Sequence, residues 1–94
     1  MKTLKEYKEL LKSKSFDEVD YVCDEMSEKN FTQEEWGKVF NKTTIRGLLG
    51  TEDPKIGVRL STALWKLDSA VWENFIEEFL AIKKLQKNKY LNAL

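Results

Sequence analysis

The sequence predicts an all-α fold, a compact bundle of five or six short helices. Three observations support this prediction. Ser or Thr is followed three residues later by Glu at three places within residues 1–35, and this spacing is typical of a helix N-terminus. Apolar residues recur three and four positions apart, which is the period of a helix with one buried face. No segment alternates between apolar and polar residues in the manner of a half-buried strand.

The first two helices follow the first two capping signals. Thr3 with Glu6 opens a helix expected over residues 3–14, and Ser15 with Glu18 opens the second. In each case the side chain satisfies a backbone N–H that the first helical turn leaves unpaired. The apolar face of the second helix consists of Phe16, Val19, Val22, Cys23 and Met26.

Thr32 with Glu35 opens a third helix, flanked by Phe31 and Trp36 at the positions of a hydrophobic staple. This helix is expected to end near Phe40. A fourth follows at "TTIRGLL", and Gly50 is expected to end it in the left-handed conformation. Gly37 lies inside the third helix, where glycine costs about 1 kcal/mol relative to alanine. It therefore predicts a close crossing with a neighbouring helix.

The last two helices follow Asp53-Pro54 and Asp68-Ser69. Asp is a favoured N-cap, and Pro is tolerated at the first helical position, where its missing N–H costs nothing. The fifth helix has an apolar stripe that leaves Trp65 at its edge. The stripe consists of Ile56, Leu60, Ala63, Leu64 and Leu67. The sixth is expected over about residues 69–86, and its apolar face consists of Trp72, Phe75, Ile76, Phe79 and Leu80.

Residues 1–94 are expected to form one helical domain, with one core. The chain has no His and one Cys, Cys23. These residues cannot build a zinc site or a nucleophile–imidazole pair, so no enzyme, metal or cofactor is expected. A buried, unreactive Cys23 fits a reducing cytoplasm. Charges interrupt the N-terminus, and no apolar run approaches the ~18 residues that span a bilayer, so neither secretion nor membrane contact is expected.

The zero net charge conceals strong segregation along the chain. Residues 1–15 carry five Lys and two Glu, and residues 16–35 carry eight acidic residues and one Lys. Residues 36–66 form a basic centre, residues 67–82 carry only acidic charges, and the last segment adds four Lys. The sequence therefore predicts a basic centre between two acidic segments.

From about residue 19 to residue 67 the pattern resembles the λ-repressor-like helix-turn-helix domain of phage repressors and Xre-type antitoxins, closest to antitoxins of the host-inhibition type. The stretch "DEMSEKNFTQEEWGKVF" is similar to the first two helices of that family, and "TTIRGLLG" is similar to its recognition helix. "DPKIGVRLSTALWKLDSAVWENF" is similar to the segment that follows. The turn after Phe40 is shorter than in the family, which would shift the recognition helix relative to the one before it.

The resemblance implies a small DNA-binding transcription regulator or antitoxin with duplex DNA as its partner. Gln33, at the start of the second motif helix, would contact a phosphate or a base edge. Lys42, Thr43, Thr44 and Arg46 would lie on or just before the recognition helix, where Arg can pair with guanine and Thr with a thymine methyl group. Lys38, Lys55 and Arg59 would attract phosphates.

A second hypothesis is a protein-binding inhibitor or adaptor of the phage or mobile-element type. The acidic second helix would engage a basic partner protein, such as a toxin or a nuclease, through Asp17, Asp20, Asp24 and Glu28. Trp65 would serve as an aromatic anchor. Alternatively, these acidic residues form only a solvated helix face. A homodimer is left open as a third arrangement.

Overall fold

Six helices make up the chain in the computed structural model, which describes the backbone of residues 2–51, 53–67 and 69–93, and the side chains of these residues except 69 and 86–93. The helices are α1 (Leu4–Leu11), α2 (Phe16–Glu28), α3 (Gln33–Val39), α4 (Lys42–Leu49), α5 (Pro54–Leu64) and α6 (Ser69–Ala93). The described residues contain no strand. The all-helical prediction is confirmed, at the upper end of the expected number of helices.

The N-termini of α1, α2 and α3 form as the capping signals predict. Thr3 Oγ1 accepts from the Glu6 N–H at 3.2 Å, and the Glu6 carboxylate accepts from the Thr3 N–H at 3.1 Å. Thr32 and Glu35 make the same reciprocal pair at 3.2 and 2.8 Å. The Ser15 hydroxyl accepts from the backbone N–H of the residue three positions on, at 3.3 Å. Each cap fixes the residue at which its helix begins.

Two further N-caps begin α4 and α5. Asn41 Oδ1 accepts from the Thr44 N–H at 2.9 Å, so α4 begins directly after Asn41. Asp53 Oδ1 accepts from the Lys55 N–H at 2.9 Å, with Pro54 at the first helical position as predicted. Only two residues, Phe40 and Asn41, therefore separate α3 from α4.

The prediction for Gly50 is wrong. Gly50 has φ −66° and continues the right-handed turn, and its N–H donates to the Arg46 carbonyl at 2.9 Å. The Thr51 hydroxyl donates to the Leu48 carbonyl at 2.8 Å. Because this side chain and the last turn of backbone bonds already satisfy the terminal carbonyls, no left-handed residue is needed here.

The left-handed conformation instead occurs after α1 and α2, at Lys14 (φ 56°) and Asn30 (φ 54°). Asn adopts it more readily than most residues, whereas Lys pays a steric cost. The reversal after Asn30 is closed by the Phe31 N–H, which donates to the Met26 carbonyl at 3.4 Å. The chain leaves α1 at Leu11, earlier than the expected residue 14.

All six helices contribute to one core. Its largest fully buried side chains include Tyr7, Phe40, Met26 and Ile45, and Cys23 is also fully buried. Trp36 stacks on Phe40 with ring centroids 5.8 Å apart. Leu80 was expected on the apolar face of its helix but is 59% exposed, because the residues that face the core are Val71, Phe75 and Glu78. The buried cluster joins helices from both ends of the chain.

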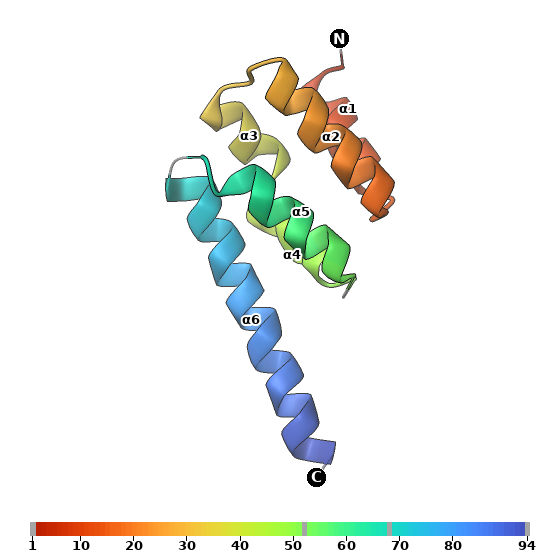
Figure 1. Cartoon of the computed structure of the whole chain (residues 1–94), viewed down its shortest axis with the longest axis vertical. Helices are drawn as coiled ribbons and strands as arrows, with labels where there is room; N and C mark the ends of the chain where they lie inside the picture. Colours follow the sequence, from red (N-terminus) through yellow and green to blue (C-terminus); the bar gives the residue numbers. More distant parts are fainter. Residues whose placement is uncertain (1, 52, 68, 94) are drawn as a thin grey trace.

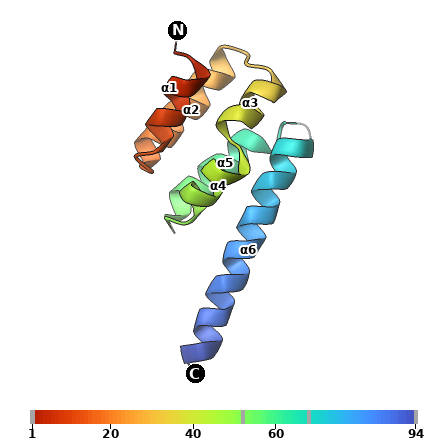
Figure 2. The same ribbon diagram turned by 180° about the vertical axis from the view of Figure 1, so that it is seen from behind.

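Figures 1 and 2 show the helices from opposite sides. α2 and α5 lie side by side on the face nearer the viewer in Figure 1, and α1, α3 and α4 lie on the face nearer the viewer in Figure 2. α6 packs against α3, α4 and α5 and then continues beyond them as a single protruding helix. It ends at Ala93 rather than near residue 86 as predicted. No helix in the described ranges combines the length and apolar character needed to cross a bilayer.

Candidate nucleic-acid interface

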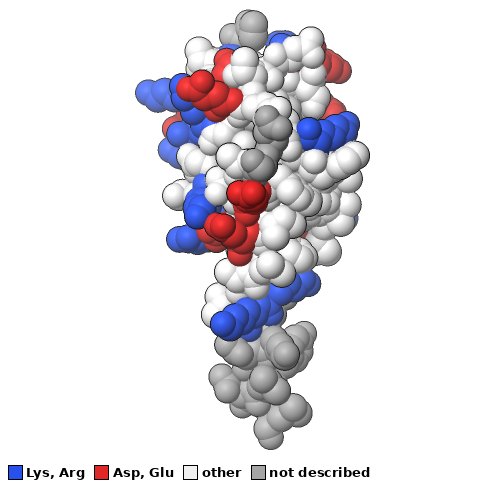
Figure 3. Space-filling view, turned by 90° about the vertical axis from the view of Figure 1, so that its left-hand side faces the viewer, with Lys and Arg blue, Asp and Glu red and all other residues white. Residues whose placement is uncertain are grey.

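The two basic residues predicted to read DNA from α4 are both held by carboxylates of α6. Arg46 Nε and Nη2 donate to Glu78 Oε2 and Oε1, each at 3.0 Å, in a two-point pair. Lys42 Nζ lies 2.9 Å from Glu77 Oε2. On the face shown in Figure 3, red side chains gather midway down the molecule, with blue ones beside them. A nucleic acid would have to compete with these internal partners.

Glu78 is the one buried charged residue among those described. Its hydrogen bonds from Arg46 lower the pKa of the Glu78 carboxyl, against the opposing effect of desolvation. The same hydrogen bonds raise the pKa of Arg46. Because two-point pairs of this kind have fixed geometry, the contact orients α4 against α6. Arg46 thus has a structural role that its sequence position did not reveal.

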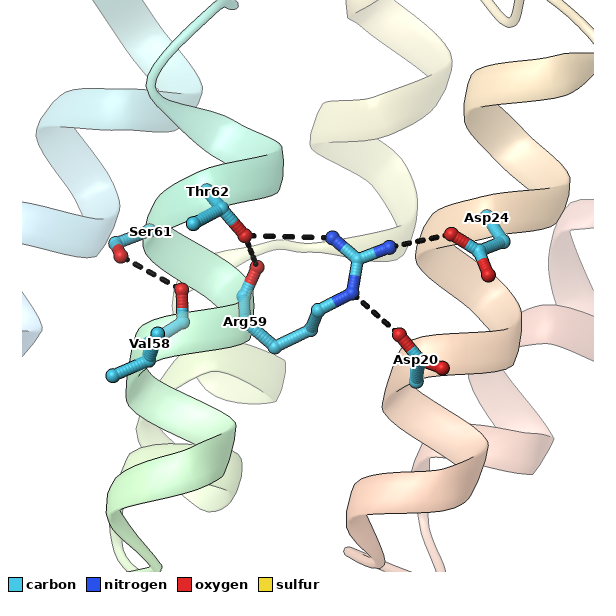
Figure 4. Close-up of polar contacts among 6 residues, drawn as sticks. All are labelled: Asp20, Asp24, Val58, Arg59, Ser61 and Thr62. Carbon is cyan, nitrogen blue, oxygen red and sulfur yellow. Dashed lines mark hydrogen bonds and ion pairs between the residues drawn. The ribbon is translucent and has the colours of Figure 1, made fainter.

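Arg59 joins two groups of residues that the sequence assigned to different functions. Its Nε donates to Asp20 Oδ1 at 2.6 Å, and its Nη2 donates to Asp24 Oδ1 at 2.7 Å. Figure 4 shows the guanidinium reaching from α5 across to both carboxylates of α2, with Thr62 beside it. The predicted phosphate contact is therefore paired with two of the predicted protein contacts. Together they link α5 to α2.

A basic groove lies between α1, α3 and α4, on the face of the molecule opposite α2 and α5. Its upper part, of about 850 Å³, lies between α1 and α3. Its lower part, of about 320 Å³, lies between α1 and α4, and Lys8 and Lys12 line both parts. Its basic lining residues are Lys5, Lys8, Lys12, Lys14 and Lys38. We call the two parts together the lysine groove.

Thr43 and Thr44 form the α4 wall of the lysine groove. They are the second and third residues of α4. The aliphatic part of Lys14 crosses to the same helix, where its Cε lies 3.6 Å from the position that a Cβ on Gly47 would occupy. The groove thus brings three of the predicted DNA-contacting residues together with lysines of α1 and of the loop that follows it.

Few carboxylates balance the charge of the lysine groove. Glu9 is the acidic residue of its lining, and it pairs with Lys12 at 2.8 Å. Lys38 pairs loosely with Glu34 at 3.6 Å. Among the described residues, Lys5, Lys8 and Lys14 have no ion-pair partner. Like charges three or four positions apart on a helix destabilise it by about 0.2–0.5 kcal/mol per pair, so the arrangement does not serve the stability of α1.

The lysines of α1 were not among the residues proposed from the sequence. The signal was present, because residues 1–15 carry five Lys, and Lys5, Lys8 and Lys12 follow one another at spacings of three and four. That spacing puts them on one side of a helix. Which helix faces that side could not be read from the sequence, since it depends on how α1 packs against α3 and α4.

The remaining DNA candidates lie apart from the lysine groove. Lys55 is exposed at the start of α5, on the far side of the molecule, and lines a different groove. Gln33 is exposed as the first residue of α3 and is not among the residues that line the lysine groove. Of the eight DNA candidates, Lys38, Thr43 and Thr44 line the lysine groove, and the other five lie outside it.

The acidic helix borders an apolar groove. This second groove, of about 380 Å³, runs between the start of α2 and α5 and is lined by Phe16, Pro54, Lys55, Val58, Arg59 and Thr62. Asp17 and Glu28 are exposed on α2. Trp65 is 61% exposed, as its position at the edge of the α5 stripe predicted. We call this surface the α2–α5 groove.

Metal-ligating side chains do not cluster in the described part of the chain. No group of three or more Cys, Asp or Glu residues is placed to hold a metal ion there. Burial raises the pKa of the Cys23 thiol to about 12, so the thiolate is strongly disfavoured. The chain matches no known protein family, and neither the curated protein sequences nor the solved structures contain a significant match.

Proposed function

We propose that the protein binds duplex DNA and acts as a small transcription regulator or antitoxin, with the lysine groove as its phosphate-binding surface. The observation that carries this proposal is the convergence of five lysines on one groove whose lining includes a single carboxylate, in a chain of zero net charge. Local charge of one sign in a concave surface attracts a polyanion even where the whole molecule is neutral.

In this proposal α3 and α4 act as a helix-turn-helix pair joined by an unusually short turn. The hydroxyls and methyl groups of Thr43 and Thr44 would meet phosphates or thymine methyl groups, while the lysines hold the backbone. Lys42 and Arg46 would exchange their α6 carboxylates for DNA. The two-point geometry of Arg46 suits guanine as well as it suits Glu78.

Salt dependence provides the first test. If four of the lysines contact phosphates, raising salt from ~50 to ~200 mM should weaken binding to a labelled duplex on the order of 100-fold. Fluorescence anisotropy measures this directly. A parent protein that shows no salt-sensitive binding to duplex DNA at ~50 mM salt would overturn the proposal.

Charge reversal provides the second test. Lys8→Glu with Lys14→Glu should weaken duplex binding at least tenfold, because both side chains line the lysine groove. Lys55→Glu with Lys66→Glu is the matched control, since it makes the same change in net charge outside that groove. Circular dichroism shows whether each variant is folded. Equal losses in both variants would assign the binding to general charge attraction and not to the lysine groove.

The α2–α5 groove supports a second candidate, the protein-binding inhibitor or adaptor. Val58 is 63% exposed there, and Arg59 of the same lining contacts Asp20 and Asp24 of α2. A basic partner with an apolar anchor would fit this surface. Under this hypothesis Val58→Glu abolishes binding to the partner and Lys8→Glu with Lys14→Glu leaves it unchanged. Under the leading proposal Val58→Glu leaves DNA binding unchanged, and Lys8→Glu with Lys14→Glu weakens it.

A further inference from the structure

The last described side chains of α6, at residues 83–85, are exposed. Ile82 is the last described side chain of α6 that packs against the core, and Leu85 is 64% exposed. The helix nevertheless continues to Ala93. An isolated helix shorter than about 12–15 residues is only marginally stable in water, and most helical stability comes from packing of an apolar face. A partner that covers the exposed side chains at residues 83–85 would therefore stabilise this part of α6.

One side of α6 carries a stripe that is complementary to itself. Glu73, Glu77, Leu80 and Lys84 follow one another at spacings of four, three and four, so they lie along one side of the helix. All four are exposed, and Leu80 is 59% exposed at the middle of the stripe. The acidic end precedes Leu80 and the basic end follows it. In Figure 3 a blue group lies below the red side chains.

We propose that α6 pairs with α6 of a second copy of this chain in antiparallel orientation, centred near Leu80. This orientation sets Leu80 against its own counterpart and places Glu73 and Glu77 of one copy beside Lys84 of the other. Charged flanks of this kind set partner choice and orientation in paired helices. Glu77 also contacts Lys42 within each copy at 2.9 Å, and that exposed pair leaves its carboxylate accessible.

The shape of the molecule favours the antiparallel arrangement over the parallel one. The other five helices cover only the first part of α6, and the rest projects past them (Figure 1). In an antiparallel pair the two bodies lie at opposite ends, and each protruding segment covers the exposed side of the partner's first half. A parallel pair would place both bodies at the same end and like charges side by side.

Sedimentation velocity of the full-length chain without DNA tests this proposal. The parent should form dimers as its concentration rises, and Leu80→Glu should weaken the dimer at least tenfold. Val58→Glu is the matched control, because Val58 is exposed to the same degree on another face, at 63%, and it should leave the dimer intact. A parent that stays monomeric at millimolar concentration, or a dimer lost with Val58→Glu and retained with Leu80→Glu, would overturn the proposal.

Charge-swapped variants test the orientation. Glu73→Lys with Glu77→Lys makes the stripe basic, and Lys84→Glu makes it acidic. Each variant alone should be monomeric, and an equimolar mixture should form dimers. Added salt should weaken the parent dimer, because screening removes attraction between opposite charges. A parent dimer that strengthens with salt would show like charges side by side and so refute the antiparallel arrangement.

Discussion

The contacts of Arg59 give a quantitative test of what holds α5 to α2. Arg59→Met removes the guanidinium but keeps most of the aliphatic stem, so its main effect is the loss of the hydrogen bonds to Asp20 and Asp24. The two bonds differ in environment. The Arg59 side chain is 21% exposed, Asp20 is 44% exposed and Asp24 is 62% exposed. The bond to Asp20 should therefore be the stronger one.

The magnitudes follow from this exposure. A hydrogen bond to a charged group contributes about 1.5–3 kcal/mol when desolvated, whereas exposed ion pairs contribute about 0.2–1 kcal/mol. The half-exposed Asp20 should give a coupling energy of about 1 kcal/mol with Arg59. The more exposed Asp24 should give about 0.5 kcal/mol or less. Arg59→Met should lower the free energy of unfolding by about 1.5 kcal/mol in total.

Double-mutant cycles separate the two contributions. Asp20→Asn and Asp24→Asn are each combined with Arg59→Met, and urea unfolding followed by circular dichroism gives the coupling energies. High salt should reduce the Asp24 coupling more than the Asp20 coupling. An Arg59→Met variant as stable as the parent, or a larger coupling to Asp24 than to Asp20, would show that exposure does not rank these contacts.

Three further predictions concern single residues. A Cβ at Gly37 would lie 3.5 Å from Val71 Cγ2, which is ordinary van der Waals contact. Gly37→Ala should therefore raise the free energy of unfolding, measured by urea titration, by about 0.5–1 kcal/mol. A variant less stable than the parent would show that the helices cross more closely than this distance indicates. The hydrogen bonds from Arg46 are the main cause of the lowered pKa of Glu78. The parent should therefore be more stable than Glu78→Gln, fully so above the ordinary pKa of 4.5, and this difference should disappear as the pH falls through the lowered pKa. A stability difference that acid leaves unchanged would contradict the pairing. Cys23 is fully buried with a pKa raised to about 12, so a thiol reagent at pH 8 should label it only on unfolding, and rapid labelling of the folded protein would contradict its burial.

Local signals in the sequence were enough to predict the helices. The Thr3, Ser15, Thr32 and Asp53 caps form within three residues of chain, so nothing distant has to be known to place them. Gly50 was predicted wrongly for a local reason as well. A glycine after a helix often adopts the left-handed conformation, but the Thr51 hydroxyl here supplies the bond that such a turn would have provided.

The candidate site depends on contacts between distant residues, and these were not visible in the sequence. The sequence predicts Arg46 as a DNA contact, but in the structure Arg46 pairs with Glu78, which is 32 positions away in the chain. Arg59 is engaged in the same way by Asp20, 39 positions away. Conversely, the lysines of α1 gain a common groove only because α3 and α4 pack beside that helix. Sequence spacing shows which side chains share a helix face, and tertiary packing decides which faces meet.

At Lys14, stability and the proposed DNA binding favour different residues. Its backbone is left-handed (φ 56°), a conformation that costs an L-residue roughly 1–2 kcal/mol and that glycine adopts freely. A protein engineer seeking a higher melting temperature would therefore choose glycine here. The same change would remove one positive charge from the wall of the lysine groove. Thermostabilised versions of this chain obtained without selecting for binding should accumulate substitutions at this position first.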